Sequence, residues 1–310
     1  MNRHTTSGRW GLGITLALFT TAIWGLIPVI LKVLIQGLDP YSITFYRFLI
    51  AAVLAGIAVI HRHDFKSLIR NIRGIYLILA LTASVSFAGS YILYPLALEY
   101  VSPSTAQVLN QLSYVFMLVG GVAFYHERLG LLQAVGGIIL FLGMLLFFNE
   151  RFDELLSGTG VLYSGIILIM CGAVCLAAYT LIQKQLLLIL PSEGIMFLVY
   201  IAGTLLLFPL AEPEKIMTLS ASQATLLIIS APVTLIAFVS LSESLHHLEL
   251  NRVSMILASV PLATVAAMTV CSSLFPDVLE PEQLNTLSLA GAVLVVVGTM
   301  LGSLRVGRER

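Results

Sequence analysis

Four polar side chains recur at helical spacing inside one apolar stretch of the sequence, residues 104–124. They are Gln107, Asn110, Gln111 and Tyr114. The spacing i, i+3, i+4, i+7 places all four on one face of a helix. Because amides that face lipid are costly, this face is expected to meet protein or a water-filled cavity. We predict that it lines a substrate cavity. The alternative is hydrogen bonding between packed helices.

Aromatic side chains are available to complete such a cavity. Tyr91 and Tyr94 share one face of the stretch over residues 74–98, and Trp24 lies in the middle of the first stretch. Rings with a few polar groups are what an enclosed small-molecule site needs. We predict that these residues bind substrate together with Tyr179. The alternatives are interfacial anchoring for the tyrosines and ordinary helix packing for Trp24.

Two charged residues are candidates for gating or ion coupling. Arg47 is the one cation away from the ends of the apolar stretches, and an ionisable residue there is a functional hypothesis by default. Facing inward, it would attract an anionic or zwitterionic substrate or brace a gate. Alternatively, its long stem reaches the outer headgroups. Glu243 could carry a proton in exchange for substrate, although its position near the end of its stretch favours a solvated residue.

Other chemistry finds little support in the sequence. Glu243 lies close to His246, His247 and Glu249, but ligands from one helix end make a weak metal site without converging partners. The three cysteines all lie within apolar stretches, where thiols usually serve as packing residues. The sequence contains no Walker motif, which argues against direct ATP hydrolysis. We therefore expect no catalytic residue, no metal and no cofactor.

Ten apolar stretches must position these residues. Hydrophobic residues make up 58% of the chain and charged residues 10%, against roughly 25% charged residues in a soluble domain. Most stretches reach the roughly 17–25 residues that a helix needs to cross a bilayer, where the backbone must be helical. The predicted stretches are 12–34, 41–60, 74–98, 104–124, 130–148, 160–182, 194–211, 224–246, 252–275 and 284–304.

The basic residues between the stretches fall on alternating sides. With the N-terminus in the cytoplasm, twelve Lys and Arg residues lie inside and only Lys32, Arg151 and Lys215 lie outside. This bias follows the positive-inside rule and predicts ten transmembrane helices with both termini cytoplasmic. The first stretch is interpreted as a retained span rather than a signal peptide. A formal net charge of zero gives no support for a nucleic-acid partner.

Weak self-similarity divides the ten stretches into two groups of five. ERLGLLQAVGGIILFLG from Glu127 aligns without a gap with EQLNTLSLAGAVLVVVG from Glu282. Because five is odd, the second group must enter the membrane from the opposite side. The sequence therefore predicts two inverted five-helix repeats, residues 10–149 and 158–305. In such architectures the substrate site lies near the midplane between the halves.

Two further features of the repeats carry structural predictions. Glu127 and Glu282 lie at membrane surfaces, and we predict that each caps the helix that follows it. Gly298 and Gly302 form a GxxxG spacing, which favours close helix packing. We interpret this packing as a contact within the protein, with a dimer contact as the alternative.

Three segments resemble the EamA branch of the drug/metabolite transporter superfamily. They are AIWGLIPVILK from Ala22, YRFLIAAVL from Tyr46 and the YHERLG that contains Glu127. The resemblance covers nearly the whole chain. It implies ten helices, cytoplasmic termini and a central cavity lined by the first, third, fourth, sixth, eighth and ninth helices. It does not specify a substrate, because the family carries many small metabolites.

These observations predict a secondary transporter of the cell inner membrane. It would move a small polar or amphipathic metabolite, such as an amino acid, by alternating access. Export is implied by the resemblance alone. The alternative is an integral-membrane enzyme that modifies a lipid or metabolite, for which no nucleophile–base pair is visible. The expected partners are the substrate and the bilayer. The sequence leaves open whether protons are the coupling ion and whether the protein is a monomer or a homodimer.

Overall fold

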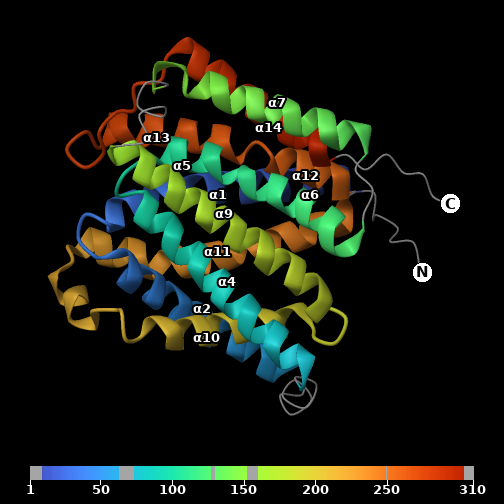
Figure 1. Ribbon diagram of the computed structural model, residues 1–310. Helices are drawn as coiled ribbons and strands as arrows, with labels where there is room; N and C mark the ends of the chain where they lie inside the picture. The colour runs from blue at the N-terminus through green and yellow to red at the C-terminus, as the bar shows by residue number, and fades with distance from the viewer. Residues whose placement is uncertain (1–8, 63–72, 127–129, 152–159, 249, 304–310) are drawn as a thin grey trace.

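All regular secondary structure in the described part of the chain is helical (Figure 1). The structure is a computed structural model of the 310-residue chain, and it describes residues 9–62, 73–126, 130–151, 160–248 and 250–303. The first half holds α1 (Trp10–Leu34), α2 (Pro40–Arg62), α4 (Ile75–Ala97), α5 (Pro103–Asn110), α6 (Leu112–Tyr125) and α7 (Leu131–Phe147). The second half holds α9 (Val161–Leu186), α10 (Ser192–Leu207), α11 (Ala221–His247), α12 (Leu250–Leu257), α13 (Val260–Leu274) and α14 (Thr286–Ser303). Short 3-10 helices span Asn149–Arg151 and Pro213–Thr218.

The lengths and composition of these helices are those of a membrane protein. Among the described residues, seven helical segments are long and apolar enough to cross a bilayer. Three shorter apolar helices accompany them, over Leu131–Phe147, Glu193–Leu207 and Thr286–Gly302. The prediction of an all-α integral membrane protein is confirmed, whereas ten complete crossings stay a prediction.

The outside of the helix bundle is apolar, as a lipid-facing surface requires. On α7, Ile138, Phe141 and Leu142 are exposed, and similar side chains are exposed on most other helices. A soluble monomer rarely exposes contiguous apolar patches of this extent. The helices therefore present leucine, isoleucine and phenylalanine to hydrocarbon.

Each of the most extensive helix contacts joins one half of the chain to the other. These contacts are α7 with α14, α4 with α9, α1 with α11 and α2 with α10. The same contacts recur when each helix is replaced by its counterpart in the other half. The α4–α9 contact then corresponds to α11–α1, and the α6–α9 contact corresponds to α13–α1. The two halves are therefore interleaved rather than placed side by side.

Four glycines bring α7 and α14 into backbone contact. A Cβ on Gly136 would lie 2.6 Å from the carbonyl oxygen of Gly298, and a Cβ on Gly298 would lie 2.7 Å from that of Gly136. Gly143 and Gly291 form a second reciprocal pair, with corresponding distances of 2.9 and 2.7 Å. Any side chain at these positions would force the helices apart. The GxxxG spacing thus serves packing within the protein, as predicted.

Polar side chains join α7 and α14 at one end of this contact. Asn149 and Asn285 exchange hydrogen bonds, with Nδ2–Oδ1 distances of 2.9 and 3.2 Å. The Ser288 hydroxyl donates to the Phe147 carbonyl at 2.9 Å. These bonds satisfy carbonyl and amide groups where the helices end.

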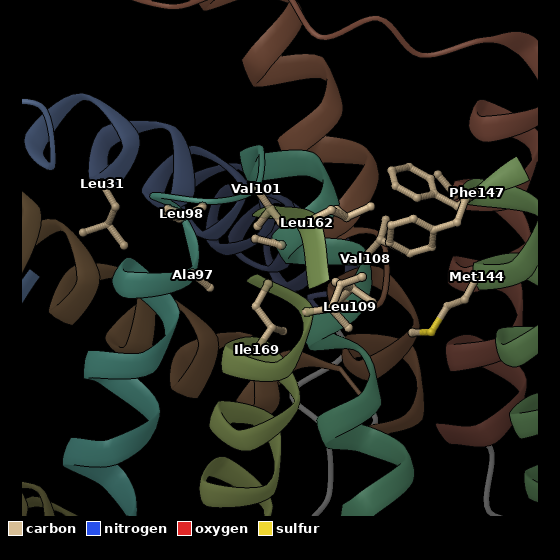
Figure 2. Close-up of a cluster of buried hydrophobic side chains, with 14 of the residues drawn as sticks. Leu31, Ala97, Leu98, Val101, Val108, Leu109, Met144, Phe147, Leu162 and Ile169 are labelled. Atoms are coloured by element: carbon tan, nitrogen blue, oxygen red, sulfur yellow. The ribbon is translucent and has the colours of Figure 1, made fainter. Parts of the chain in front are cut away.

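The largest buried apolar cluster lies at the end of the molecule where α4 leads into α5 and α13 leads into α14. We call this the acidic end, because Glu99, Asp277, Glu280 and Glu282 lie there. Figure 2 shows side chains of α1, α4, α5, α7 and α9 gathered in the cluster. The apolar cluster consists of Leu31, Leu34, Leu38, Ile43, Ala97, Leu98, Val101, Ala106, Val108, Leu109, Leu140, Met144, Phe147, Phe148, Leu162, Ile166, Ile169, Leu227, Ala292 and Val295.

Adjacent glycines on α7 offer a matched test of the backbone contact. Gly136→Ala should lower the thermal stability of the purified protein by the equivalent of about 1–3 kcal/mol, the usual cost of overpacking. Gly137→Ala should leave it unchanged or slightly higher, because a Cβ there meets nothing within 4 Å and alanine is the better helix former. Thermal unfolding in detergent measures both. Equal melting temperatures for the two variants would contradict the α7–α14 packing.

Candidate functional site

Two helices are interrupted at corresponding places in the two halves. The first interruption separates α5 from α6 at Gln111, and the second separates α12 from α13 at Ala258 and Ser259. The stretches predicted as continuous over residues 104–124 and 252–275 are therefore each divided. In transporters built from repeats, interrupted helices in matching positions mark the substrate region.

The carbonyl groups released by the interruptions are bonded to nearby hydroxyls. The Ser113 hydroxyl donates to the Asn110 carbonyl at 2.7 Å, and the Ser259 hydroxyl donates to the Ile256 carbonyl at 2.5 Å. The Ile256 carbonyl also accepts a bond from Thr21 of α1 at 3.4 Å. Backbone polar groups at membrane depth are thereby satisfied inside the protein.

Helix α1 crosses α13 close to the second interruption. A Cβ on Gly25 would lie 2.7 Å from the Cβ of Ala263, so the two helices touch at this point. The neighbouring Trp24 is partly buried, and its ring packs edge-on against Phe238 of α11 at 5.3 Å between centroids. Trp24 thus lies where α1 meets two helices of the second half.

The predicted tyrosines and amides of α4 and α5 come into direct contact. The Tyr94 hydroxyl donates to Gln107 Oε1 at 2.8 Å. Asn110 is the last residue of α5 and is partly buried, beside the first interruption. Tyr94 and Gln107 therefore form a polar pair between α4 and α5, and Asn110 lies one helical turn after Gln107.

The polar residues of this span contact two different helices. Thr299 of α14 donates to Gln111 Oε1 at 3.3 Å, and Tyr114 lies against Gly302 of the same helix. Gln107 faces α4 instead. The backbone at Gln111 keeps right-handed helical angles, with φ −63° and ψ −16°. That all four side chains line one substrate cavity stays a prediction.

Arg47 is buried in a cluster of aromatic rings. Its side chain is 5% exposed, and its Cζ lies 5.8 Å from the centre of the Tyr91 ring. Nη2 donates to the Thr234 hydroxyl of α11 at 3.3 Å. The alternative in which its stem reaches the outer headgroups is excluded by this burial. Tyr91 and Tyr94 lie one helical turn apart on α4, so Arg47 adjoins the polar pair described above.

The aromatic cluster consists of Phe48, Phe87, Tyr91, Tyr179 and Tyr200. Its ring centroids are separated by 4.5–5.5 Å, a range typical of attractive ring pairs. Tyr91 and Tyr179 were predicted from the sequence as site residues, whereas Tyr200 was not. Thr234, whose hydroxyl accepts the Arg47 hydrogen bond, was not predicted either. Neither residue carries a local signal, since each joins the group only through contacts between halves.

Glu243 lies apart from these residues. It belongs to the last turns of α11, its side chain is 55% exposed, and its Oε1 lies 3.2 Å from His247 Nε2. Glu249, the further metal ligand considered above, lies outside the described residues. Among those that are described, no group of three or more His, Cys, Asp or Glu residues could hold a metal ion. A gating or coupling role for Glu243 stays a prediction.

A pocket of about 1060 Å³ opens at the acidic end. It is lined by the loops over residues 99–105 and 276–284 and by the end of α1, and it contains none of the ten predicted site residues. Val101 belongs both to its lining and to the apolar cluster. The pocket is therefore an acidic vestibule that borders the apolar cluster, against which Tyr94 also packs.

Glu282 joins the two halves at this vestibule. Its Oε1 accepts a hydrogen bond from the backbone N–H of Ser104 at 3.2 Å, in the first turn of α5. The expectation that Glu282 caps the helix that follows it is therefore wrong, because it caps a helix of the other half. Lys32 of α1 donates to the Leu98 and Val101 carbonyls between α4 and α5. Glu127 lies outside the described residues.

Comparison with known proteins shows what the chain is similar to. The model of the EamA-like transporter family matches residues 11–149 and 163–304, one match in each half. The uncharacterized inner membrane transporter YhbE of Escherichia coli (strain K12) is 36% identical over 199 residues, which cover 64% of this chain and 61% of that protein. An uncharacterized transporter of Haemophilus influenzae is 34% identical over 190 residues, 61% of each chain. These matches span less than two thirds of the relatives' length.

A solved crystal structure has the same fold. It superposes with a TM-score of 0.61 at 16% sequence identity, and the match covers 94% of this chain and 97% of the other. At this identity the likeness concerns the fold alone.

Removal of the Glu282 side chain should weaken the closure of the acidic end. Glu282→Ala should lower the melting temperature by the equivalent of about 1 kcal/mol, because a helix N-terminus loses a charged acceptor. Glu280→Ala is the matched control, since Glu280 is an exposed residue of the same loop. If the control destabilises the protein as much as Glu282→Ala does, the capping contact is not what holds α5 to the second half.

Proposed function

Because the chain belongs to the EamA-like transporter family, we propose that it is a secondary transporter that works by alternating access. Its substrate is a small polar or amphipathic metabolite such as an amino acid, and net transport is outward. The substrate occupies the region between the two helix interruptions, where Trp24, Tyr94, Gln107 and Asn110 lie.

The observation that carries this proposal is an asymmetry in how the halves pack. At the acidic end, α5 contacts α1 of its own half and α13 of the other half. When each helix is replaced by its counterpart in the other half, these contacts correspond to α12 with α9 and α12 with α6 at the opposite end of the molecule. Neither pair is among the extensive contacts of the described residues. One end is therefore closed by contacts that the other end lacks.

Such an asymmetry is what alternating access requires. In an inverted repeat, each half can adopt the packing of the other, which converts closure at one end into closure at the other. The apolar cluster, with Glu282 and Lys32 above it, closes the acidic end in the state described. The reverse state would bring α12 onto α6 and α9 and separate α5 from α13.

The charge distribution supports a definite orientation. Of the basic residues outside the spans, twelve lie on one side of the membrane and three on the other. By the positive-inside rule, this bias supports an orientation in which the acidic end faces away from the cytoplasm. Ten crossings then put both termini in the cytoplasm. In this orientation the loosely packed end faces the cytoplasm, where an exporter takes up its substrate.

Reconstitution tests the proposal directly. Purified protein in lipid vesicles should exchange a labelled metabolite across the bilayer in counterflow, with no covalent change in the metabolite. Turnover of a lipid or metabolite in place of exchange would instead indicate an enzyme. Repeating the assay with and without a pH gradient shows whether protons drive transport.

A conservative substitution locates the substrate region. Tyr94→Phe removes the hydroxyl that bonds Gln107 and should lower the exchange rate roughly 3- to 10-fold, the effect of one hydrogen bond. Tyr163→Phe is the control, because Tyr163 is exposed on the outside of α9. Equal rates for wild type and Tyr94→Phe would place the substrate elsewhere.

A further inference from the structure

Arg47 carries a charge at a depth where a charge needs a partner. It lies in the second turn of α2, within a helix long and apolar enough to span the bilayer, and its side chain is 5% exposed. A buried cation is stable only when it is paired or fully hydrogen-bonded. The position that corresponds to Arg47 in the second half is apolar, Leu198, so the site occurs once in the molecule.

The described residues leave this charge incompletely satisfied. Thr234 is the one hydrogen-bond acceptor for the guanidinium among them, at a long distance of 3.3 Å. Nε is buried and has no hydrogen-bond partner in the same part of the chain. The described carboxylates form no ion pair with Arg47. The Tyr91 ring contributes a cation–π contact, which is weaker than an ion pair.

The geometry of the free donor matches a carboxylate. In a guanidinium, the N–H groups of Nε and one terminal nitrogen lie along the same edge, and together they donate two parallel hydrogen bonds, as a fork, to the oxygens of a carboxylate. Here Nε is unpartnered, and Nη2 donates to a hydroxyl that already donates to the Ser230 carbonyl at 2.7 Å. A carboxylate would satisfy Nε and replace or share the weak bond to Thr234.

The surroundings set the charge and character of the ligand. Tyr91 lies against Arg47, and the remaining rings of the aromatic cluster continue from it, so a ligand bound to the guanidinium would lie among apolar and aromatic side chains. Lys32 is held by backbone carbonyls at the acidic end and is not available as a second cation. One cation balances one negative charge. A phosphate dianion would bring an unbalanced charge into a buried site.

We propose that Arg47 binds the carboxylate of the transported metabolite, so that the substrate is a small carboxylic acid or zwitterion with an apolar body. This inference rests on the proposed transport function and specifies its substrate class. The contact also links the halves, because Arg47 belongs to α2 and Thr234 to α11 of the second half. A carboxylate that displaces Thr234 would release one cross-half bond as substrate binds.

Paired ligands test the proposal on the purified full-length protein. A thermal-shift panel would compare carboxylates such as phenylacetate and L-leucine, each beside its carboxamide, with chloride and inorganic phosphate. Ligands stabilise the folded state by mass action. We expect organic carboxylates to raise the melting temperature at millimolar concentration and their carboxamides to bind roughly 10- to 100-fold more weakly. The proposal is overturned if no carboxylate binds, if each carboxamide binds equally well, or if chloride or phosphate gives the same shift.

Substitutions at Arg47 test whether this residue causes the preference for an acid over its carboxamide. Arg47→Gln should abolish the preference for the acid over its carboxamide while leaving carboxamide binding unchanged, which a loss of packing alone would not produce. Arg47→Lys keeps the charge but loses the fork, so it should retain a weakened preference even if Arg47→Gln fails to fold. Arg73→Gln, at an exposed residue before α4, is the control. An undiminished preference in the Arg47→Lys variant would contradict the fork geometry.

Vesicle assays separate this inference from the transport proposal. If wild type and Arg47→Gln exchange a labelled carboxylate at equal rates, the protein is a transporter and the carboxylate assignment is wrong. If a carboxylate binds through Arg47 but is never exchanged across the bilayer, the binding site stands and the transport proposal fails.

Discussion

The absence of water in the bilayer interior governs how this chain can fold. Lipid tails are as apolar as leucine, so burial of apolar surface gives no net drive for one membrane helix to join another. Close van der Waals contact and a small number of hydrogen bonds must hold the helices together instead. The backbone approach at Gly136, Gly143, Gly291 and Gly298 supplies the first, and the Asn149–Asn285 pair supplies the second.

The same constraint explains why the polar contacts are concentrated between the halves. A hydroxyl or amide buried in hydrocarbon must find a partner. Tyr94 and Gln107 join two helices of one half, whereas the bonds of Arg47 with Thr234 and of Glu282 with Ser104 join the two halves. Such bonds are few and weak enough to exchange. A transporter needs this property, because each half must release one set of contacts to form another.

Sequence reasoning predicted the apolar stretches and the repeat well, because both depend on local composition. It did not predict the interruptions at Gln111 and Ser259. Proline near a break is a usual signal, and Pro261 follows the second one, but no glycine or proline lies at the first. Nothing in the sequence therefore indicates that Gln107 bonds to α4 while Gln111 bonds to α14.

By itself, the sequence determined that the chain is an all-helical membrane protein built from two similar halves, since hydropathy and charge bias report which residues can lie in lipid. Only the tertiary structure decided which residues meet. Arg47 and Thr234 lie 187 positions apart, and Ser104 and Glu282 lie 178 apart. Helical periodicity shows that a side chain faces inward, but it carries no information about the helix it will face, because interleaving of the halves sets that neighbour.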